Sequence, residues 1–111
     1  MQSATLSHTA ALVRFGHALS DETRAQILLA LRVAPARPSD LADALGVSRQ
    51  VMSNQLACLR GCGLVSAVPD GRRTWYRLAE PEIAAGLNDL LSLVLTVDPD
   101  CCAESGCACN E

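Results

Sequence analysis

The six cysteines are the residues whose type and spacing point most clearly to chemistry. Cys58 and Cys62 lie four residues apart in the middle of the chain. The other four fall within the last eleven residues: Cys101, Cys102, Cys107 and Cys109. No secretion signal accompanies them, so we expect thiols in a reducing cytoplasm rather than a disulfide scaffold. Because thiolates bind soft metal ions, metal binding is their leading chemical use.

The Cys58–Cys62 spacing is that of two ligands on one face of a helix. Residues four apart on a helix have Cβ atoms about 5 to 6 Å apart, so two thiolates can share one ion. A third ligand from the tail, Cys101 or Cys102, would complete a trigonal site, and a fourth would make it tetrahedral. Such sites suit Cd(II), Pb(II) or As(III), and the spacing also tolerates Zn(II). We expect Cys107 and Cys109 to be spare.

The segment that must position the first pair follows two predicted helices. Apolar residues at helical spacing predict a helix from about Ser7 to Leu19. Ser20 then serves as the N-cap of a second helix that runs to about Val33, with acidic residues in its first turn. Pro35 and the proline that follows it at position 38 end this second helix.

Two further helices form a helix-turn-helix pattern. Ser39 is predicted to cap the short helix "DLADALG", which stops at Gly46, and Ser48 caps the next helix. The expected small core of this unit consists of Leu41, Leu45, Val51, Leu56 and Leu59.

The second helix of this unit is left with polar side chains that point outward. Arginine pairs with guanine, asparagine or glutamine with adenine, and serine with phosphate or either base, so this set suits a DNA major groove. The residues are Arg49, Gln50, Ser53, Asn54 and Gln55.

The stretch "LVSAVPDGRRTWYRL" predicts a β-hairpin directly after that helix. Its two strands flank an Asp70-Gly71 turn of the type I′ kind. A hairpin in this place is a wing, and Arg72 and Arg73 at its tip would reach phosphates or the minor groove. We expect the two aromatic residues that follow, Trp75 and Tyr76, to anchor the wing to the body.

A final helix opens at Pro81 and carries a long apolar stripe. In a chain of only 111 residues such a stripe is expected to pack against a second copy. The fold class is therefore mainly α with a β-hairpin wing: a winged helix-turn-helix, α-α-α-α-β-β-α, forming a homodimer. Residues 1–98 are the predicted DNA-binding and dimerisation domain, and residues 99–111 a cysteine-rich tail. The stripe is Ile83, Leu87, Leu90, Leu91, Val94 and Leu95, and the dimer residues are Leu12, Phe15, Leu87, Leu91 and Val94.

The charged residues divide the chain into two parts of opposite sign. Residues 1–78 hold all nine basic residues, every one an arginine, against five acids, which leaves +4. Residues 79–111 hold seven acids and no base, which leaves −7. The first part suits phosphate, whereas the second repels DNA and favours cations. No apolar run reaches the roughly 18 residues that span a bilayer, so we expect a cytoplasmic protein without a membrane partner.

The segments "ALSDETRAQILLAL", "LADALGVSRQVMSNQLACLRGCGLV" and "GRRTWYRLAEPEI" together resemble the ArsR/SmtB family over residues 9–97. The resemblance implies a homodimeric repressor that sits on double-stranded operator DNA and leaves it when metal binds. One type of arsenic sensor in this family carries two cysteines in the first helix of the helix-turn-helix, but "DLADALG" has none. The zinc and nickel sensors use histidine and acidic ligands on the final helix, but "EIAAGLNDLLSLVLTV" has no histidine. "CLRGC" with a "VDPDCC" tail is similar to the cadmium and lead sensors, which implies Cys58, Cys62 and a tail cysteine as ligands.

Other uses of the cysteines stay open. The tail is similar to that of arsenic sensors that bind through a C-terminal cluster, which would make As(III) or Sb(III) the inducer. A thiol redox switch on the same DNA-binding body is another class, although vicinal and i,i+4 pairs form strained disulfides. An enzyme is not expected, because no C-x-x-C opens a helix and no acid-base partner lies near a cysteine. His8 and His17 are expected to be surface residues rather than ligands.

Overall fold

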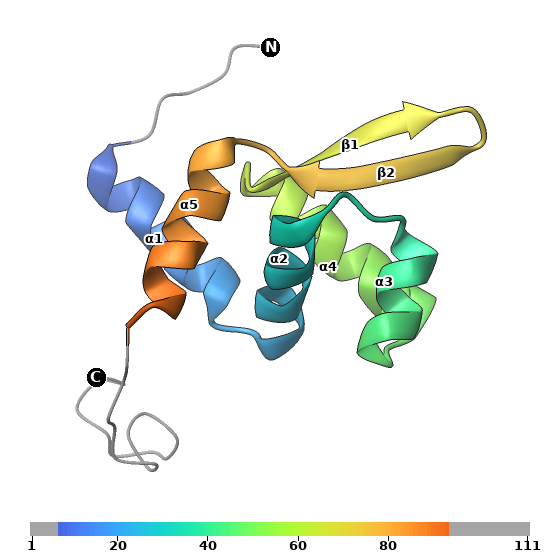
Figure 1. Ribbon diagram of the computed structural model, residues 1–111, viewed down its shortest axis with the longest axis horizontal. Helices are drawn as coiled ribbons and strands as arrows, with labels where there is room; N and C mark the ends of the chain where they lie inside the picture. Colours follow the sequence, from blue (N-terminus) through green and yellow to red (C-terminus); the bar gives the residue numbers. More distant parts are fainter. Residues whose placement is uncertain (1–6, 94–111) are drawn as a thin grey trace.

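The computed structural model describes residues 7–93, and its order of elements is the predicted one (Figure 1). Five helices and a two-stranded antiparallel sheet follow each other as α-α-α-α-β-β-α. This confirms the mainly α, winged helix-turn-helix architecture. The elements are α1 (His8–Leu19), α2 (Glu22–Val33), α3 (Pro38–Leu45), α4 (Arg49–Gly61), β1 (Val65–Asp70), β2 (Arg73–Leu78) and α5 (Pro81–Leu91).

The boundary between α1 and α2 differs by one residue from the prediction. Ser20 ends α1 in a helical conformation, and its hydroxyl donates to the carbonyl of His17 at 2.6 Å. Asp21 is the N-cap of α2, since its carboxylate accepts from the backbone N–H of Arg24 at 3.0 Å. An N-cap needs an extended backbone, which Asp21 has with φ −115° and ψ 131°. The predicted cap at Ser20 is therefore wrong.

The start of α3 also differs from the prediction. The helix begins at Pro38, and Arg37 occupies the N-cap position without a side-chain cap hydrogen bond. Proline suits the first helical position because its φ is already helical and it has no N–H to leave unpaired. Ser39 therefore lies inside the helix instead of capping it. Gly46 ends α3 with a φ of 69°, as expected for a left-handed C-terminal residue.

The core lies where α2 and α4 meet, and its largest fully buried side chains are Ile27, Leu28, Met52, Leu56 and Leu59. The prediction placed Val51 in this core, but its side chain is 40% exposed and Met52 is buried instead. Val51 points about 100° away from Met52 around the helix, and the packing of α4 on the body buries the side that carries Met52. The predicted core residues Leu41, Leu56 and Leu59 are confirmed, and Leu45 packs against them from the edge.

The wing is a tight hairpin whose register is set by the pair Asp70 and Arg73. The two-residue loop is therefore Gly71 and Arg72, one position later than predicted, and Gly71 supplies a φ of 63°. At its other end the wing is tied to the body by Tyr76. The backbone of Tyr76 donates to Ala36 at 2.8 Å and accepts from it at 3.0 Å, which confirms the predicted anchor.

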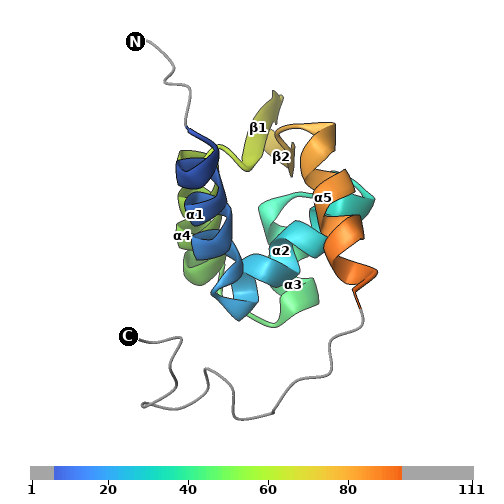
Figure 2. The ribbon, with the colours of Figure 1, turned by 90° about the vertical axis from the view of Figure 1, so that its left-hand side faces the viewer.

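The last described helix, α5, lies with α1 at the end of the molecule away from the wing tip (Figures 1 and 2). Leu87 is only 3% exposed because it packs into the protomer core, so its prediction as a dimer-surface residue is wrong. Leu90 and Leu91 remain 45% and 54% exposed. Val94 and Leu95 lie outside the described residues. Within residues 7–93, none of the helices combines the length and the apolar character needed to cross a membrane.

Candidate metal centre and nucleic-acid interface

The helix α4 begins with a capped N-terminus and an exposed polar face. The hydroxyl of Ser48 accepts from the backbone N–H of Val51 at 3.0 Å, as predicted. Met52, Leu56 and Leu59 bury the opposite face, so the helix cannot rotate freely on the body. The exposed residues of the N-terminal half include four predicted DNA contacts: Arg49, Gln50, Ser53 and Asn54.

Two of these exposed side chains are bonded to each other. The amide nitrogen of Gln50 donates to the amide oxygen of Asn54 at 3.0 Å, one helical turn away. This bond orders both side chains on the same face of α4. Each amide keeps its other polar atom free: the carbonyl oxygen of Gln50 accepts and the amino group of Asn54 donates.

Gln55 does not join that exposed group. Its side chain is half-buried on the flank of α4, and its amide oxygen accepts from the Nη1 group of Arg24 at 3.0 Å. The structure therefore separates Gln55 from the other predicted DNA contacts and joins it to α2. The role of Arg24 has a signal in the sequence. A cation in the first turn of a helix is unfavourable beside the positive end of the helix dipole, which indicates that its side chain bonds to a group outside that helix.

The wing carries its two arginines away from the body. Arg72 lies in the hairpin loop and Arg73 opens β2, and both are exposed. On the side of the hairpin that faces α3, Arg73 and Thr74 line a shallow hollow together with Arg37. Basic side chains are thus available both at the tip of the wing and beside the helix-turn-helix.

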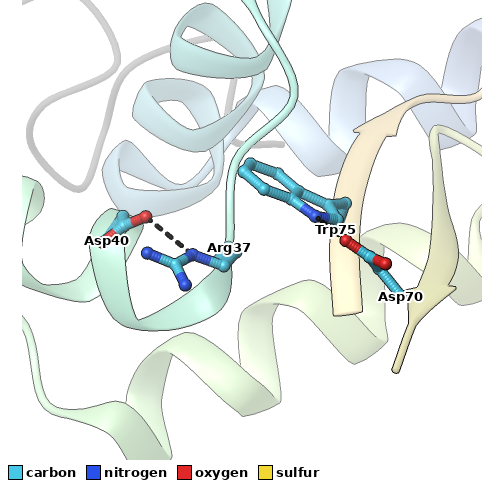
Figure 3. Close-up of polar contacts among 4 residues, drawn as sticks. All are labelled: Arg37, Asp40, Asp70 and Trp75. Atoms are coloured by element: carbon cyan, nitrogen blue, oxygen red, sulfur yellow. Dashed lines mark hydrogen bonds and ion pairs between the residues drawn. The ribbon is translucent and has the colours of Figure 1, made fainter. Parts of the chain in front are cut away.

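A short chain of polar contacts joins the wing to the start of α3 (Figure 3). The indole N–H of Trp75 donates to the carboxylate of Asp70 at 3.2 Å. The guanidinium of Arg37 lies over the Trp75 ring and also pairs with Asp40 at 3.1 Å. Trp75 therefore anchors the wing, as predicted, whereas the part played by Arg37 was missed. The only signal for Arg37 in the sequence was its position directly before Pro38, the residue that opens α3.

The cysteine pair lies at the C-terminal end of α4. Cys58 is in the last turn, and Cys62 follows the final residue with a backbone that is still helical, φ −81° and ψ −4°. The N–H of Cys62 donates to the carbonyl of Cys58 at 3.0 Å, so the two residues stack one turn apart. Both are free thiols and half-buried. The structure therefore places this pair together as the spacing predicted.

The described residues supply no complete metal site around these thiols. Within residues 7–93 there is no cluster of three or more His, Cys, Asp or Glu side chains able to hold an ion. His8 and His17 are exposed on α1, as expected for surface residues. The predicted tail ligands lie outside the described residues: Cys101, Cys102, Cys107 and Cys109.

The fold and the exposed polar helix define a winged helix-turn-helix protein, and comparison with known proteins identifies its family. The family model described as "Bacterial regulatory protein, arsR family" matches residues 21–67. The HTH-type transcriptional regulator CmtR of Mycobacterium tuberculosis (strain ATCC 25618 / H37Rv) is 49% identical over 96 residues, which cover 85% of this chain and 81% of CmtR. This chain belongs to the ArsR family, so it is a transcriptional regulator and not an enzyme.

Solved structures agree with this assignment. The NMR structure of the cadmium metal-sensor CMTR from Mycobacterium tuberculosis has a TM-score of 0.66 at 48% identity, covering 80% of this chain and 92% of that chain. The homodimeric winged helix-turn-helix DNA-binding domain of Mb0332 from Mycobacterium bovis has a TM-score of 0.68 at 29% identity, covering 81% and 90%. The predicted family resemblance is confirmed.

Proposed function

We propose that this protein is a metal-responsive repressor that binds operator DNA as a homodimer and is released by a soft thiophilic ion, Cd(II) or Pb(II). The observation that carries the proposal is the position of Cys58 and Cys62 on the helix whose opposite end exposes Arg49 and Asn54. A ligand held at one end of a rigid helix can bias contacts made at its other end. The relative CMTR is described as a cadmium metal-sensor, which supports Cd(II).

The donor set fits a soft ion. Cys58 and Cys62 are free thiols on one side of α4, and sulfur ligands select Cd(II), Pb(II), Zn(II) or As(III) over hard ions such as Mg²⁺. Because two thiolates rarely complete a site, a third ligand is required. We assign this third ligand to Cys101 or Cys102. Residues 99–111 would then act as a metal-binding tail, and residues 1–98 as the domain that binds DNA and dimerises.

The DNA interface in this proposal has two parts. Arg49, Gln50, Ser53 and Asn54 enter the major groove, where arginine and amide side chains discriminate bases. Arg72 and Arg73 contact phosphates or the adjacent minor groove through the wing. The first part provides sequence preference and the second provides affinity that depends on salt.

Release follows from the geometry of a dimer. Two recognition helices must match half-sites one DNA turn apart, so a small change in their separation weakens both contacts together. The exposed apolar side chains of Leu12 and Leu91 lie on α1 and α5, the two helices we assign to the dimer interface. The homodimeric relative Mb0332 supports this assembly. Holding Cys58 and Cys62 to a tail cysteine would change how α4 sits in the dimer.

The test is a release experiment with the reduced full-length protein. A DNA duplex is selected by the wild-type protein from a random pool, and the complex is titrated with Cd(II), Pb(II), Zn(II) and As(III). We expect Cd(II) or Pb(II) to release the DNA at the lowest concentration. Release by peroxide without any response to metal would contradict the proposal and indicate a redox switch.

A second candidate is an As(III)-responsive repressor that uses the tail alone. It is favoured by the four cysteines within the last eleven residues, which could form a thiolate cluster without α4. The same titration separates the two candidates. Release by As(III) alone, unchanged when Cys58 is replaced by serine, would favour the tail cluster and overturn the Cd(II) assignment.

A further inference from the structure

The guanidinium of Arg24 joins three helices through three hydrogen bonds. Its Nε donates to the carbonyl of Ala18 at 3.2 Å, and its Nη2 donates to the carbonyl of His17 at 3.0 Å. Its Nη1 donates to the amide oxygen of Gln55 at 3.0 Å. A single half-buried side chain of α2 therefore connects the C-terminal end of α1 to the recognition helix α4.

This arginine has no carboxylate to balance its charge in the described part of the chain. The only ion pair among residues 7–93 joins Arg37 and Asp40. The charge of Arg24 is instead stabilised by carbonyl groups in the last turn of α1, where the helix dipole is negative. A guanidinium whose three nitrogens each donate to a different acceptor resists rotation, because rotation breaks at least one of these bonds.

Gln55 cannot contact adenine in the usual way while it is bonded to Arg24. Glutamine pairs with adenine through its oxygen and its nitrogen together, so both atoms must face the base, whereas here the oxygen is directed at Arg24 on α2. The side chain is also half-buried between the core face and the exposed face of α4. Both observations set Gln55 apart from Asn54, which is exposed one residue earlier.

We propose that Gln55 is not a base-contacting residue and that Arg24 and Gln55 form a positioning pair, which fixes the orientation of α4 against the junction of α1 and α2. The pair acts on DNA only through the exposed residues that α4 carries. Because α1 also bears the exposed apolar residues Leu12 and Val13, the pair links the proposed dimer surface to the recognition helix. The inference rests on the proposed function for its DNA readout.

The deciding substitution is Gln55→Glu. A glutamate keeps an oxygen acceptor for Arg24 and pairs with its charge, but it has no N–H to donate to DNA. Gln55→Glu should therefore bind the selected duplex within about threefold of wild type, with the same base preference. The matched control is Asn54→Asp, which places a carboxylate on the exposed face and should lower affinity by at least about tenfold.

A double-mutant cycle provides a second readout. Arg24→Ala and Gln55→Ala should each lower DNA affinity without changing base preference. The double variant should bind no more weakly than Arg24→Ala alone, because both single variants remove the same Arg24–Gln55 bond. If Arg24→Ala does not fold, Gln55→Glu and Gln55→Leu decide alone, since Gln55→Leu removes the acceptor and should lose affinity.

The outcomes are distinct. If Gln55→Glu loses affinity as Asn54→Asp does, or changes base preference at one operator position, Gln55 contacts a base and the inference is overturned. If the wild-type protein binds no duplex, the proposed function fails instead. The pair is then tested by thermal unfolding, where additive effects of Arg24→Ala and Gln55→Ala would overturn it and non-additive effects would support it.

Discussion

The guanidinium carbon of Arg37 lies 5.6 Å from the centroid of the Trp75 ring, which places the residue before α3 against the middle of the second wing strand. A cation over an aromatic face is attracted by the electron density of the ring. The contact holds the wing against the helix-turn-helix, so the positions of Arg72 and Arg73 depend on a residue more than thirty positions earlier in the chain.

Replacing Trp75 with leucine should loosen the wing and lower DNA affinity by about two- to fivefold, the effect of losing one exposed cation–π contact. Trp75→Phe is the control, because it keeps an aromatic face for Arg37, although a smaller one, and loses the N–H that donates to Asp70. Fluorescence anisotropy with a labelled duplex measures both. Equal affinity for the two variants would show that the contact does not position the wing.

The two parts of the DNA interface should respond differently to substitution. Arg49→Ala or Asn54→Ala should weaken operator binding by about 1 to 3 kcal/mol and alter base preference, because these side chains would contact base edges. Arg73→Ala should weaken binding to every sequence and reduce the salt dependence by about one unit of slope. A change of sequence preference in Arg73→Ala alone would mean that α4 is not the recognition helix.

The exposed and buried leucines of α1 and α5 should separate dimerisation from folding. Leu12 is 71% exposed and Leu91 54% exposed, so Leu12→Glu and Leu91→Glu should leave the protomer folded and shift it toward the monomer. Leu87→Ala should instead cost about 2 to 5 kcal/mol of unfolding free energy, since Leu87 lies in the core. Sedimentation and thermal unfolding measure the two effects. Val68→Glu, an exposed apolar site on the wing, is the control that should stay dimeric.

The cysteine variants test the metal site directly. Cys58→Ser and Cys62→Ser should each keep operator binding and lose release by Cd(II) or Pb(II), because a hydroxyl oxygen is a hard, poor ligand for these ions. The wild-type protein with Cd(II) should show thiolate-to-metal absorption in the ultraviolet that either substitution removes. Removing the residues after Cys102 should leave the response intact. Release that survives in Cys58→Ser but disappears without Cys107 and Cys109 would move the site to the tail.

Local sequence signals predicted the elements well but placed some boundaries one residue away. Ser20 and Asp21 are both good N-cap residues, and the backbone conformation of each decided between them. The same applies to the wing, where the strand register moved the loop to Gly71 and Arg72. The position of a cap or a turn depends on a few adjacent residues. The sequence therefore limits that position to two neighbouring residues without deciding between them.

What the sequence alone determined is what depends on nearby residues: the order of helices and strands, the left-handed Gly46, the exposed polar half of α4, and the one-turn stacking of Cys58 on Cys62. The tertiary structure decided which of two adjacent apolar residues is buried, so that Met52 and not Val51 completes the core. It also turned Leu87 inward and bonded Gln55 to Arg24, thirty-one residues earlier in the chain. These outcomes depend on which helices pack against each other, because burial and long-range hydrogen bonds are set by the neighbours of a side chain in space.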